Sequence, residues 1–249
     1  MYQKERMESI MALLRRHGYL TVKFLVEELG YSTATVNRDL NRLEQMHQLK
    51  RTYGGVEPLE AQGVSLLLRY AKSKPSKKRI AKAAASLVED GDVIFIDCST
   101  TTQYMGEYLL DKKSIRVITN NLALAIHLAE NGIAVTVLGG TMTEPPFMLS
   151  GDHAVENAAR YNADKCFLST GSLSMRGEVG GSGYVLLHKE MMRHSEQTVL
   201  LMDRDKIGTR SSTNLYTLEA VNVLISDYQF SDEFRSRFPN TEFLCAEQS

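Results

Sequence analysis

TVKFLVEELGYSTATVNRDLNRLEQMHQLKRTYGGV, residues 21–56, is the stretch that decides how the front of the chain folds. Apolar residues recur at helical spacing from Val22 to Leu29 and predict a short amphipathic helix. Gly30 supplies the left-handed turn that ends this helix. Ser32 is typical of an N-cap, because its hydroxyl accepts a hydrogen bond from a free backbone N–H.

A second helix is predicted from Thr33 to Gln45, directly after this turn. Val36, Leu40 and Leu43 form its buried face, which leaves the polar side chains for the other faces. Two short helices joined by a tight turn, the second rich in Thr, Asn and Arg, are typical of a helix-turn-helix. These side chains suit base edges and phosphates, although a helical hairpin with a merely solvated polar face has the same spacing.

The residues from Leu49 to Val56 alternate and include a Gly-Gly pair. This pattern predicts a small two-stranded wing that places cationic side chains near phosphates. The turn, the second helix and the wing together give these candidate contacts to a DNA duplex: Ser32, Thr33, Thr35, Asn37, Arg38, Asn41, Arg42, Lys50, Arg51 and Tyr53.

Charge is distributed unevenly along the chain. Its 249 residues include 29 Lys+Arg and 30 Asp+Glu, a net charge of −1. The stretch Met1–Val88 holds 16 basic and 8 acidic residues, which leaves 13 basic and 22 acidic residues for the remainder. A basic front and an acidic back indicate that only the front meets a polyanion.

Composition argues against several classes of protein. Cys98, Cys166 and Cys245 lie far apart and form no CxxC pair, so neither a disulfide scaffold nor a zinc module is expected. No run is long and apolar enough to span a bilayer, and the N-terminus lacks a signal-peptide core. We therefore expect a cytoplasmic protein with no metal, cofactor or membrane partner.

Three segments are predicted along the chain. A first helix, Met1 to His17, completes a DNA-binding domain over residues 1–57. Residues 58–75 are interrupted by Pro and Gly and form a linker, with a short helix at Ser65–Ala71 as one possibility. Residues 76–249 form an effector-binding and oligomerisation domain.

Basic residues cluster on the helix that opens this last domain. Seven Lys or Arg and no acidic residue lie between Glu60 and Glu89. Lys77, Lys78 and Arg79 belong to this run. We expect them to form a solvated face, with a contact to DNA or to a ligand phosphate as the alternative.

From Gly91 onward, short apolar strands alternate with helices. Strands are predicted at Val93–Ile96, Arg116–Thr119, Ala134–Leu138, Lys165–Ser169 and Thr198–Met202. This alternation predicts an α/β fold, in which a mostly parallel sheet has helices on both faces.

Polar residues follow these strands at the points where the strands end. Ligands of open α/β sheets bind beyond the carboxyl ends of the strands. Hydroxyls before a helix N-terminus suit a phosphate, glycines permit close approach, and a lysine adds a point charge. Each residue also has an ordinary structural explanation, such as helix capping, or an ion pair of Lys206 with Asp203 or Asp205. The candidate effector residues are Asp97, Ser99, Thr100, Thr101, Thr102, Asn120, Asn121, Gly139, Gly140, Gly171 and Lys206.

Two groups of motifs resemble the DeoR family of bacterial transcriptional regulators. S-x-x-T-V-x-R-D-L-x-x-L-E runs from Ser32 to Glu44. Further on come F-I-D-x-S-T-T, V-I-T-N-N, L-G-G, Ser150-Gly151 and D-x-x-x-x-G-T-R. The resemblance covers nearly the whole chain. It implies a winged helix-turn-helix followed by a domain similar to ribose-5-phosphate isomerase and glucosamine-6-phosphate deaminase, which in this family senses a phosphorylated sugar.

We therefore expect a sequence-specific repressor of sugar-metabolism genes that binds operator DNA as a homodimer or homotetramer and responds to a phosphorylated sugar. Two alternatives remain open. One is a sugar-phosphate-converting enzyme with an accessory DNA-binding module, for which Asp97, Asp164, Glu178 and Asp203 are acid/base candidates. The other is a constitutive DNA-binding protein whose back domain only oligomerises.

Overall fold

The chain forms two compact units, Met1–Arg69 and Tyr70–Ser249. The computed structural model describes residues 3–17, 20–46, 48–52, 55–58, 73–144, 148–181 and 185–246. The predicted helix at Ser65–Ala71, most of the predicted linker, Tyr53 and the side chain of Lys50 lie outside the described residues. The domain boundaries expected near residues 57 and 76 therefore stay predictions.

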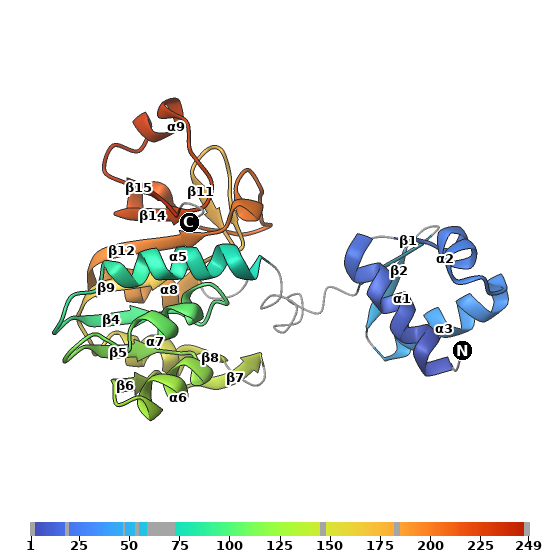
Figure 1. Cartoon of the computed structure of the whole chain (residues 1–249), viewed down its shortest axis with the longest axis horizontal. Coiled ribbons are helices and arrows are strands. Elements are labelled where there is room, and N and C mark those ends of the chain that lie inside the picture. The colour runs from blue at the N-terminus through green and yellow to red at the C-terminus, as the bar shows by residue number, and fades with distance from the viewer. Residues whose placement is uncertain are drawn as a thin grey trace. The chain divides into compact units, whose positions relative to one another are not determined.

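The first unit contains the predicted helix-turn-helix (Figure 1). Thr21 Oγ1 accepts the N–H of Phe24 at 3.1 Å and caps the first helix of the motif, which ends at Gly30 with a φ of 68°. Ser32 caps the second by accepting the N–H of Thr35 at 3.3 Å. The elements are α1 (Gln3–His17), β1 (Leu20–Thr21), α2 (Val22–Leu29), α3 (Thr33–Gln45), β2 (Leu49–Thr52) and β3 (Gly55–Pro58).

The predicted two-stranded wing is present as β2 and β3, and the short strand β1, which was not predicted, joins it in a three-stranded sheet. β1 pairs with β3, which pairs with β2, and all the pairs are antiparallel. Leu20 lies opposite Val56, and both side chains are buried in the core that the three helices share. A two-residue strand is too short to show an alternating pattern, which explains why the sequence did not reveal it.

The second unit is built on the predicted parallel sheet. Seven strands lie in the order β15-β14-β12-β9-β4-β5-β6, and every pair in this sheet is parallel. All the carboxyl ends therefore meet at one edge. The strands are β4 (Val93–Ile96), β5 (Arg116–Thr119), β6 (Ala134–Val137), β9 (Ala163–Leu168), β12 (Ser195–Met202), β14 (Val223–Ser226) and β15 (Glu242–Cys245).

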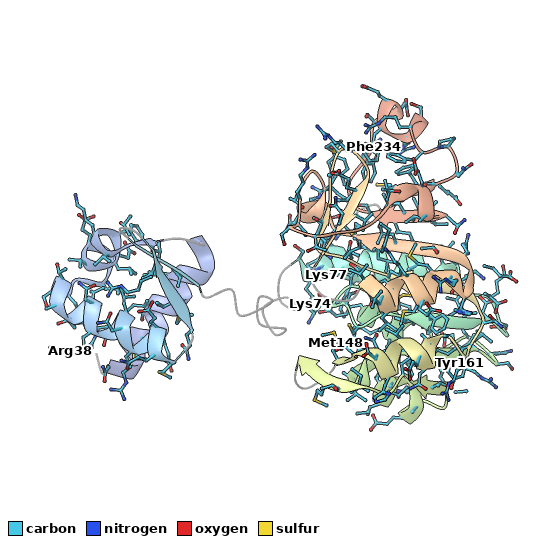
Figure 2. All side chains as sticks on the ribbon, turned by 180° about the vertical axis from the view of Figure 1, so that it is seen from behind. Arg38, Lys74, Lys77, Met148, Tyr161 and Phe234 are labelled. Carbon is cyan, nitrogen blue, oxygen red and sulfur yellow. The ribbon has the colours of Figure 1, made fainter. Side chains whose placement is uncertain are left out.

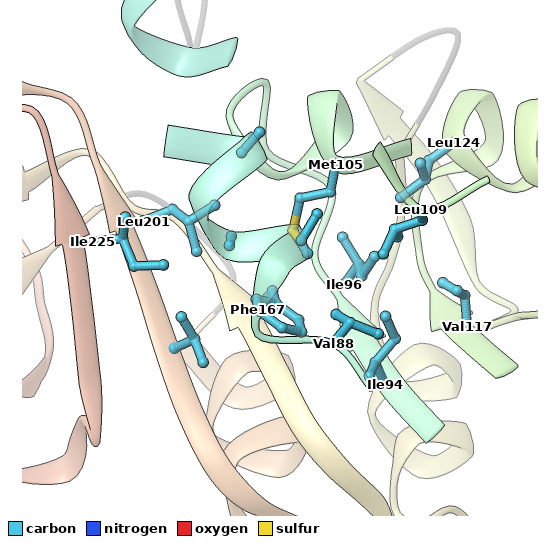
Figure 3. Packing of buried hydrophobic residues seen from close by; sticks show 14 of the residues in the cluster. Val88, Ile94, Ile96, Met105, Leu109, Val117, Leu124, Phe167, Leu201 and Ile225 are labelled. Atoms are coloured by element: carbon cyan, nitrogen blue, oxygen red, sulfur yellow. The ribbon is translucent and has the colours of Figure 1, made fainter. Parts of the chain in front are cut away.

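Helices cover both faces of this sheet, as predicted (Figure 1). Ile94 and Ile96 of β4 face the core that Figure 3 shows, whereas Phe95 between them belongs to the core of the opposite face. α5 (Lys74–Ser86), η1 (Thr102–Tyr108) and α6 (Leu122–Glu130) contribute to the first core. The second core receives side chains from α7 (Asp152–Ala158), α8 (Val185–Arg193) and α9 (Asp232–Ser236).

Three further features of this unit were not predicted. The segment after β4 is the 3-10 helix η1, in which Gly106 packs closely against Leu124. β7 (Thr141–Glu144) and β8 (Met148–Ser150) form a hairpin. A small antiparallel sheet consists of β10 (Ser172–Leu173), β11 (Glu178–Gly180) and β13 (Asn214–Thr217), which are too short to show a period. The remaining short elements are η2 (Arg204–Lys206) and η3 (Leu218–Ala220).

Neither a membrane-spanning helix nor a cluster of metal-binding side chains is found among the described residues. None of their helices has the length and apolar character that crossing a membrane needs. Nor do their His, Cys, Asp and Glu side chains gather in threes that could hold a metal ion.

Candidate functional site

A buried carboxylate fixes α3 against α1 in the first unit. Asp39 is fully buried, and it accepts hydrogen bonds from Arg6 Nη2 and Gln3 Nε2, each at 3.1 Å. Burial alone would raise the pKa of Asp39, but the hydrogen bonds from Arg6 and Gln3 outweigh it and lower that pKa. The guanidinium of Arg6 also lies 5.0 Å from the ring centre of Tyr31. The face of α3 opposite this anchor is left for other partners.

That opposite face is polar and open. Thr33, Arg38 and Asn41 are exposed, and Figure 2 shows Arg38 on the surface of its unit. Asn37, half-buried, donates from Nδ2 to the carbonyl oxygen of Thr33 at 3.0 Å. Arg51 of β2 reaches the same face, where its Nη1 donates to Asn41 Oδ1 at 2.5 Å. Cationic and amide side chains of this kind suit base edges and phosphates.

Some residues that were predicted to contact DNA form hydrogen bonds within the protein. Ser32 and Thr35 share a hydrogen bond of 2.9 Å between their hydroxyls, so both contribute to the helix cap. Arg42 Nη1 donates to Gln3 Oε1 at 3.4 Å. Direct contact of any of these residues with DNA stays a prediction.

In the second unit, Asp97 organises the loop that follows β4. It is 2 % exposed, and its Oδ2 accepts the N–H of Ser169 at 2.9 Å. Oδ1 accepts the Ser99 N–H at 3.0 Å and the Thr102 hydroxyl at 2.5 Å. His188 of α8 places Nε2 3.3 Å from Oδ2. Burial pushes the pKa of Asp97 up, but His188, the Ser169 N–H and Thr102 together lower it, so the carboxylate is held as the anion.

Two lysines approach the ends of neighbouring strands. Lys77 of α5 is 4 % exposed, and its Nζ donates to Thr100 Oγ1 at 3.0 Å in the loop after β4. Lys206 Nζ donates to Ser169 Oγ at 3.0 Å after β9, and lies 3.4 Å from Asp203 Oδ2. β4 and β9 are paired in the sheet. The structure therefore brings two ammonium groups to one stretch of the carboxyl edge.

Buried polar atoms without a hydrogen-bond partner lie in this same part of the unit. Among the described residues, these include Thr101 Oγ1, Asn120 Oδ1, His188 Nδ1 and the Tyr216 hydroxyl. The rings of His188 and Tyr216 are 6.5 Å apart. Burial, followed by the charge of Asp97, raises the pKa of Tyr216 well above its ordinary value, so its hydroxyl keeps the proton. Buried groups of this kind usually find a partner, which a bound ligand can supply.

The other predicted effector residues have local contacts. Asn121 caps α6 by accepting the Leu124 N–H at 3.1 Å, and its Nδ2 donates to Gln103 Oε1 at 3.1 Å. A Cβ on Gly140, whose φ is 141°, would lie 2.3 Å from the carbonyl oxygen of Ser150, so this glycine permits the β8 strand to pack closely.

The two remaining glycines also contact protein atoms. A Cβ on Gly139 would lie 3.2 Å from Asn157 Nδ2. The N–H of Gly171 donates to the Gly180 oxygen at 3.0 Å, so this residue lies next to β10 of the small antiparallel sheet and contacts β11.

Sequence reasoning missed two residues of this site, His188 and Tyr216, and gave Lys77 a place in it only as the alternative. Lys77 was expected on a solvated face, and that expectation is wrong because the side chain is buried against Thr100. Its spacing from Ile80, Ala81 and Ala84, which share one helical face, was the available signal. His188 lies three residues before the buried Met191 on α8, so its spacing from that residue was a signal of the same kind. Tyr216 carried no signal, because only non-local strand pairing brings it to His188.

Comparison with known proteins gives matches over both units. The DeoR-like helix-turn-helix domain matches residues 6–62, and the DeoR C terminal sensor domain matches residues 72–228. The HTH-type transcriptional repressor GlcR of Bacillus subtilis is 30% identical over 98% of this chain and 92% of its own length. The Glycerol-3-phosphate regulon repressor of Escherichia coli is 26% identical over 91% of this chain and 92% of its own length.

Among solved structures, ribose 5-phosphate isomerase A of Methanocaldococcus jannaschii is similar over 55% of each chain, with 18% identity and a TM-score of 0.41. This is a partial likeness of fold. The sensor-domain match alone covers more than half of the sequence, and the helix-turn-helix match covers most of the rest. The chain belongs to the DeoR family of transcriptional regulators.

Proposed function

We propose that this protein is a repressor of sugar-metabolism genes, and that a phosphorylated sugar bound at the carboxyl edge of the sheet controls its operator binding. The observation that carries the proposal is the approach of Lys77 and Lys206 to hydroxyls at the ends of β4 and β9. Two ammonium groups beside serine and threonine hydroxyls match the charge and the acceptor oxygens of a phosphate.

The rest of the ligand would meet uncharged polar groups. Thr101 Oγ1 and Asn120 Oδ1 are buried and have no hydrogen-bond partner within the described residues. The threonine hydroxyl can donate, whereas the asparagine oxygen can only accept. Sugar hydroxyls both donate and accept, so they suit this pair. The name of one relative, the Glycerol-3-phosphate regulon repressor of Escherichia coli, supports a phosphorylated ligand.

α5 is the element through which ligand binding would reach the DNA-binding unit. It begins at Lys74 and is the first described helix after residue 58, and Lys77 lies in its first turn (Figure 2). A phosphate that holds Lys77 would restrain the point where the linker enters the sensor unit. Such a ligand changes operator binding only if its affinity differs between the two arrangements of a homodimer or homotetramer.

Sensing rather than conversion is supported by how the carboxylates are used. The Asp97 carboxylate accepts from Ser99, Ser169 and Thr102 and faces His188, so it is a poor candidate for a general base. Glu178 accepts from the Ser174 hydroxyl at 2.9 Å and lies 3.5 Å from Arg210 Nη2. The relatives named above are likewise regulators. A repressor of this kind acts in the cytoplasm, at the nucleoid.

A thermal-shift screen tests the proposal. Phosphorylated sugars and their unphosphorylated counterparts are compared on the full chain, and the best ligand is then added to a titration of operator DNA. We expect a phosphorylated sugar to raise the Tm and to weaken operator binding, and its unphosphorylated counterpart to do neither. Equal shifts from both forms would contradict a phosphate site. If no ligand changed the affinity for operator DNA, the alternative of a constitutive DNA-binding protein would be favoured.

A further inference from the structure

Arg51 joins the wing to the exposed face of α3. Its Nη1 donates to Asn41 Oδ1, its Nη2 donates to Asn37 Oδ1, and its backbone N–H donates to Glu44 Oε1 at 3.1 Å. Asn37 and Asn41 are four residues apart, so their side chains neighbour each other on one side of the helix. The guanidinium is therefore clamped at two points on the face that the helix-turn-helix offers to DNA.

The clamp engages the side-chain oxygens with which the two asparagines would read a base. Specific recognition of adenine by asparagine uses the side-chain oxygen and the amide nitrogen together. Asn37 commits its oxygen to Arg51 and donates from its nitrogen to the Thr33 carbonyl at 3.0 Å. Asn41 likewise commits its oxygen to Arg51. Both amides are arranged to hold the guanidinium.

The guanidinium itself keeps donors for DNA. An arginine side chain has five N–H groups, and the two asparagines take one from each terminal nitrogen. Both asparagines are uncharged, so they leave the positive charge of Arg51 intact. A point charge for phosphate needs no fixed orientation, whereas bidentate binding to the O6 and N7 of guanine does.

We propose that Arg51 is a specificity-determining residue that reads a guanine in the operator, and that Asn37 and Asn41 are its positioning residues. The inference deepens the proposed function and rests on it. Arg51 supplies the base contact from the wing, and the asparagines of α3 fix its plane. The recognition surface is therefore shared between a strand and a helix.

The test is selection from a pool of randomised DNA duplexes by the full-length protein, followed by titration of the selected duplex. The wild type should enrich a motif with a guanine preferred over other bases by roughly tenfold. Arg51→Lys keeps the charge but loses the planar fork, so that preference should disappear while the salt dependence of binding stays unchanged. Asn37→Ala combined with Asn41→Ala should weaken the same guanine preference. Lys23→Ala, at an exposed position of α2, serves as a control and should leave the motif intact.

The outcomes separate this inference from the proposed function. A wild-type motif that Arg51→Lys leaves unchanged would overturn the inference alone. The inference would also be overturned if changing the asparagines abolished a preference for adenine while Arg51→Lys left the motif unchanged. That result would show that the asparagines recognise the base. A wild-type protein that enriches no motif would contradict the proposed function as well. Circular dichroism of each variant verifies that the fold is kept.

Discussion

The two units arrange their polar groups in opposite ways. In the first unit, Asp39 ties α3 to α1 from within, and Arg38, Asn41 and Arg51 stand exposed on the outside. In the second unit, most of the groups at the sheet edge are themselves buried, as Lys77 at 4 % exposure illustrates. A duplex is too large to be enclosed, so it must be met by an outer surface, whereas a small anion can be surrounded. The placement of polar groups thus indicates the size of each partner.

The same contrast governs how the two sites respond to salt. Exposed charges are screened over about 8 Å at physiological ionic strength, and buried charges are screened far less. We expect DNA binding by the first unit to fall steeply with salt, and ligand binding by the second unit to fall little. The variants below test whether each unit depends on its own set of groups.

Asp97→Ala should have the largest effect, and only on the second unit. The change leaves His188, Thr102 and the Ser169 N–H without their buried acceptor, which should lower the free energy of unfolding of this unit by about 3 kcal/mol. Urea unfolding followed by circular dichroism measures the loss. Asp111→Ala, at an exposed position, is the matched control, and an equal loss in both would remove the special role of Asp97.

Lys77→Met should weaken binding of the phosphorylated ligand by roughly 10- to 100-fold, the value of a charge-assisted hydrogen bond. Methionine fills a similar volume, so the fold and ligand-free operator binding should be kept. Lys78→Met is the control, because Lys78 pairs with the exposed Glu107 at 2.7 Å. Calorimetry with the screened ligand gives both affinities. If Lys77→Met and Lys78→Met bound the ligand with similar affinities, the phosphate would have to bind away from Lys77.

Arg38→Ala should weaken operator binding by about tenfold and leave the ligand-induced thermal shift unchanged. Arg38 is exposed on α3, so removing it costs DNA contact without disturbing the core. If Arg38 binds phosphate, the slope of log K against log salt should also fall by about one. Titrations at several salt concentrations measure both quantities. If Arg38→Ala bound the operator with the affinity of the wild type, Arg38 would not be part of the DNA interface.

A smaller effect is expected from acid. The folded protein lowers the pKa of Asp39 and of Asp97 below the ordinary value of 3.8. A lowered pKa stabilises the fold above that ordinary value, and this stabilisation is lost as pH falls through the lowered pKa. Urea midpoints between pH 5 and pH 3 should therefore decrease, and Asp39→Asn should flatten the decrease in the first unit. An unchanged profile would show that Asp39 does not carry this dependence.

No effect at all is expected when sugar phosphates are incubated with the protein and the products are analysed. Asp97, Asp164 and Glu178 hold structural hydrogen bonds, and Asp203 lies 3.4 Å from Lys206 Nζ, so turnover should be absent. Product formation that Asp97→Asn abolishes would restore the enzyme alternative. Heat-denatured protein is the control for spontaneous conversion.

The sequence predicted the elements whose patterns are local. Helix spacing and the Ser32 cap gave the helix-turn-helix, and alternation gave the parallel sheet with its two covered faces. Features that depend on distant partners were not predictable in this way. β1 exists because Leu20 meets Val56, and Tyr216 reaches His188 only through the small antiparallel sheet.

Side-chain roles were harder to predict than elements. The residue types around Asp97 pointed to the carboxyl edge of the sheet, but not to which groups there would be engaged with each other. Ser99 and Thr102 hold Asp97, whereas Lys77, interpreted as solvated, faces the loop. Hydrogen-bond partners are set by tertiary packing, which spacing along the chain does not record.

Each unit has hydrophobic cores of its own among the described residues. One core contains side chains only from residues 7–56, and the other two only from residues 80–246. Each half can therefore be inherited, or exchanged in the laboratory, as a cassette. A hybrid gene joined within residues 59–72 should keep the promoter choice of one parent and the metabolite preference of the other, which is the design rule for a biosensor.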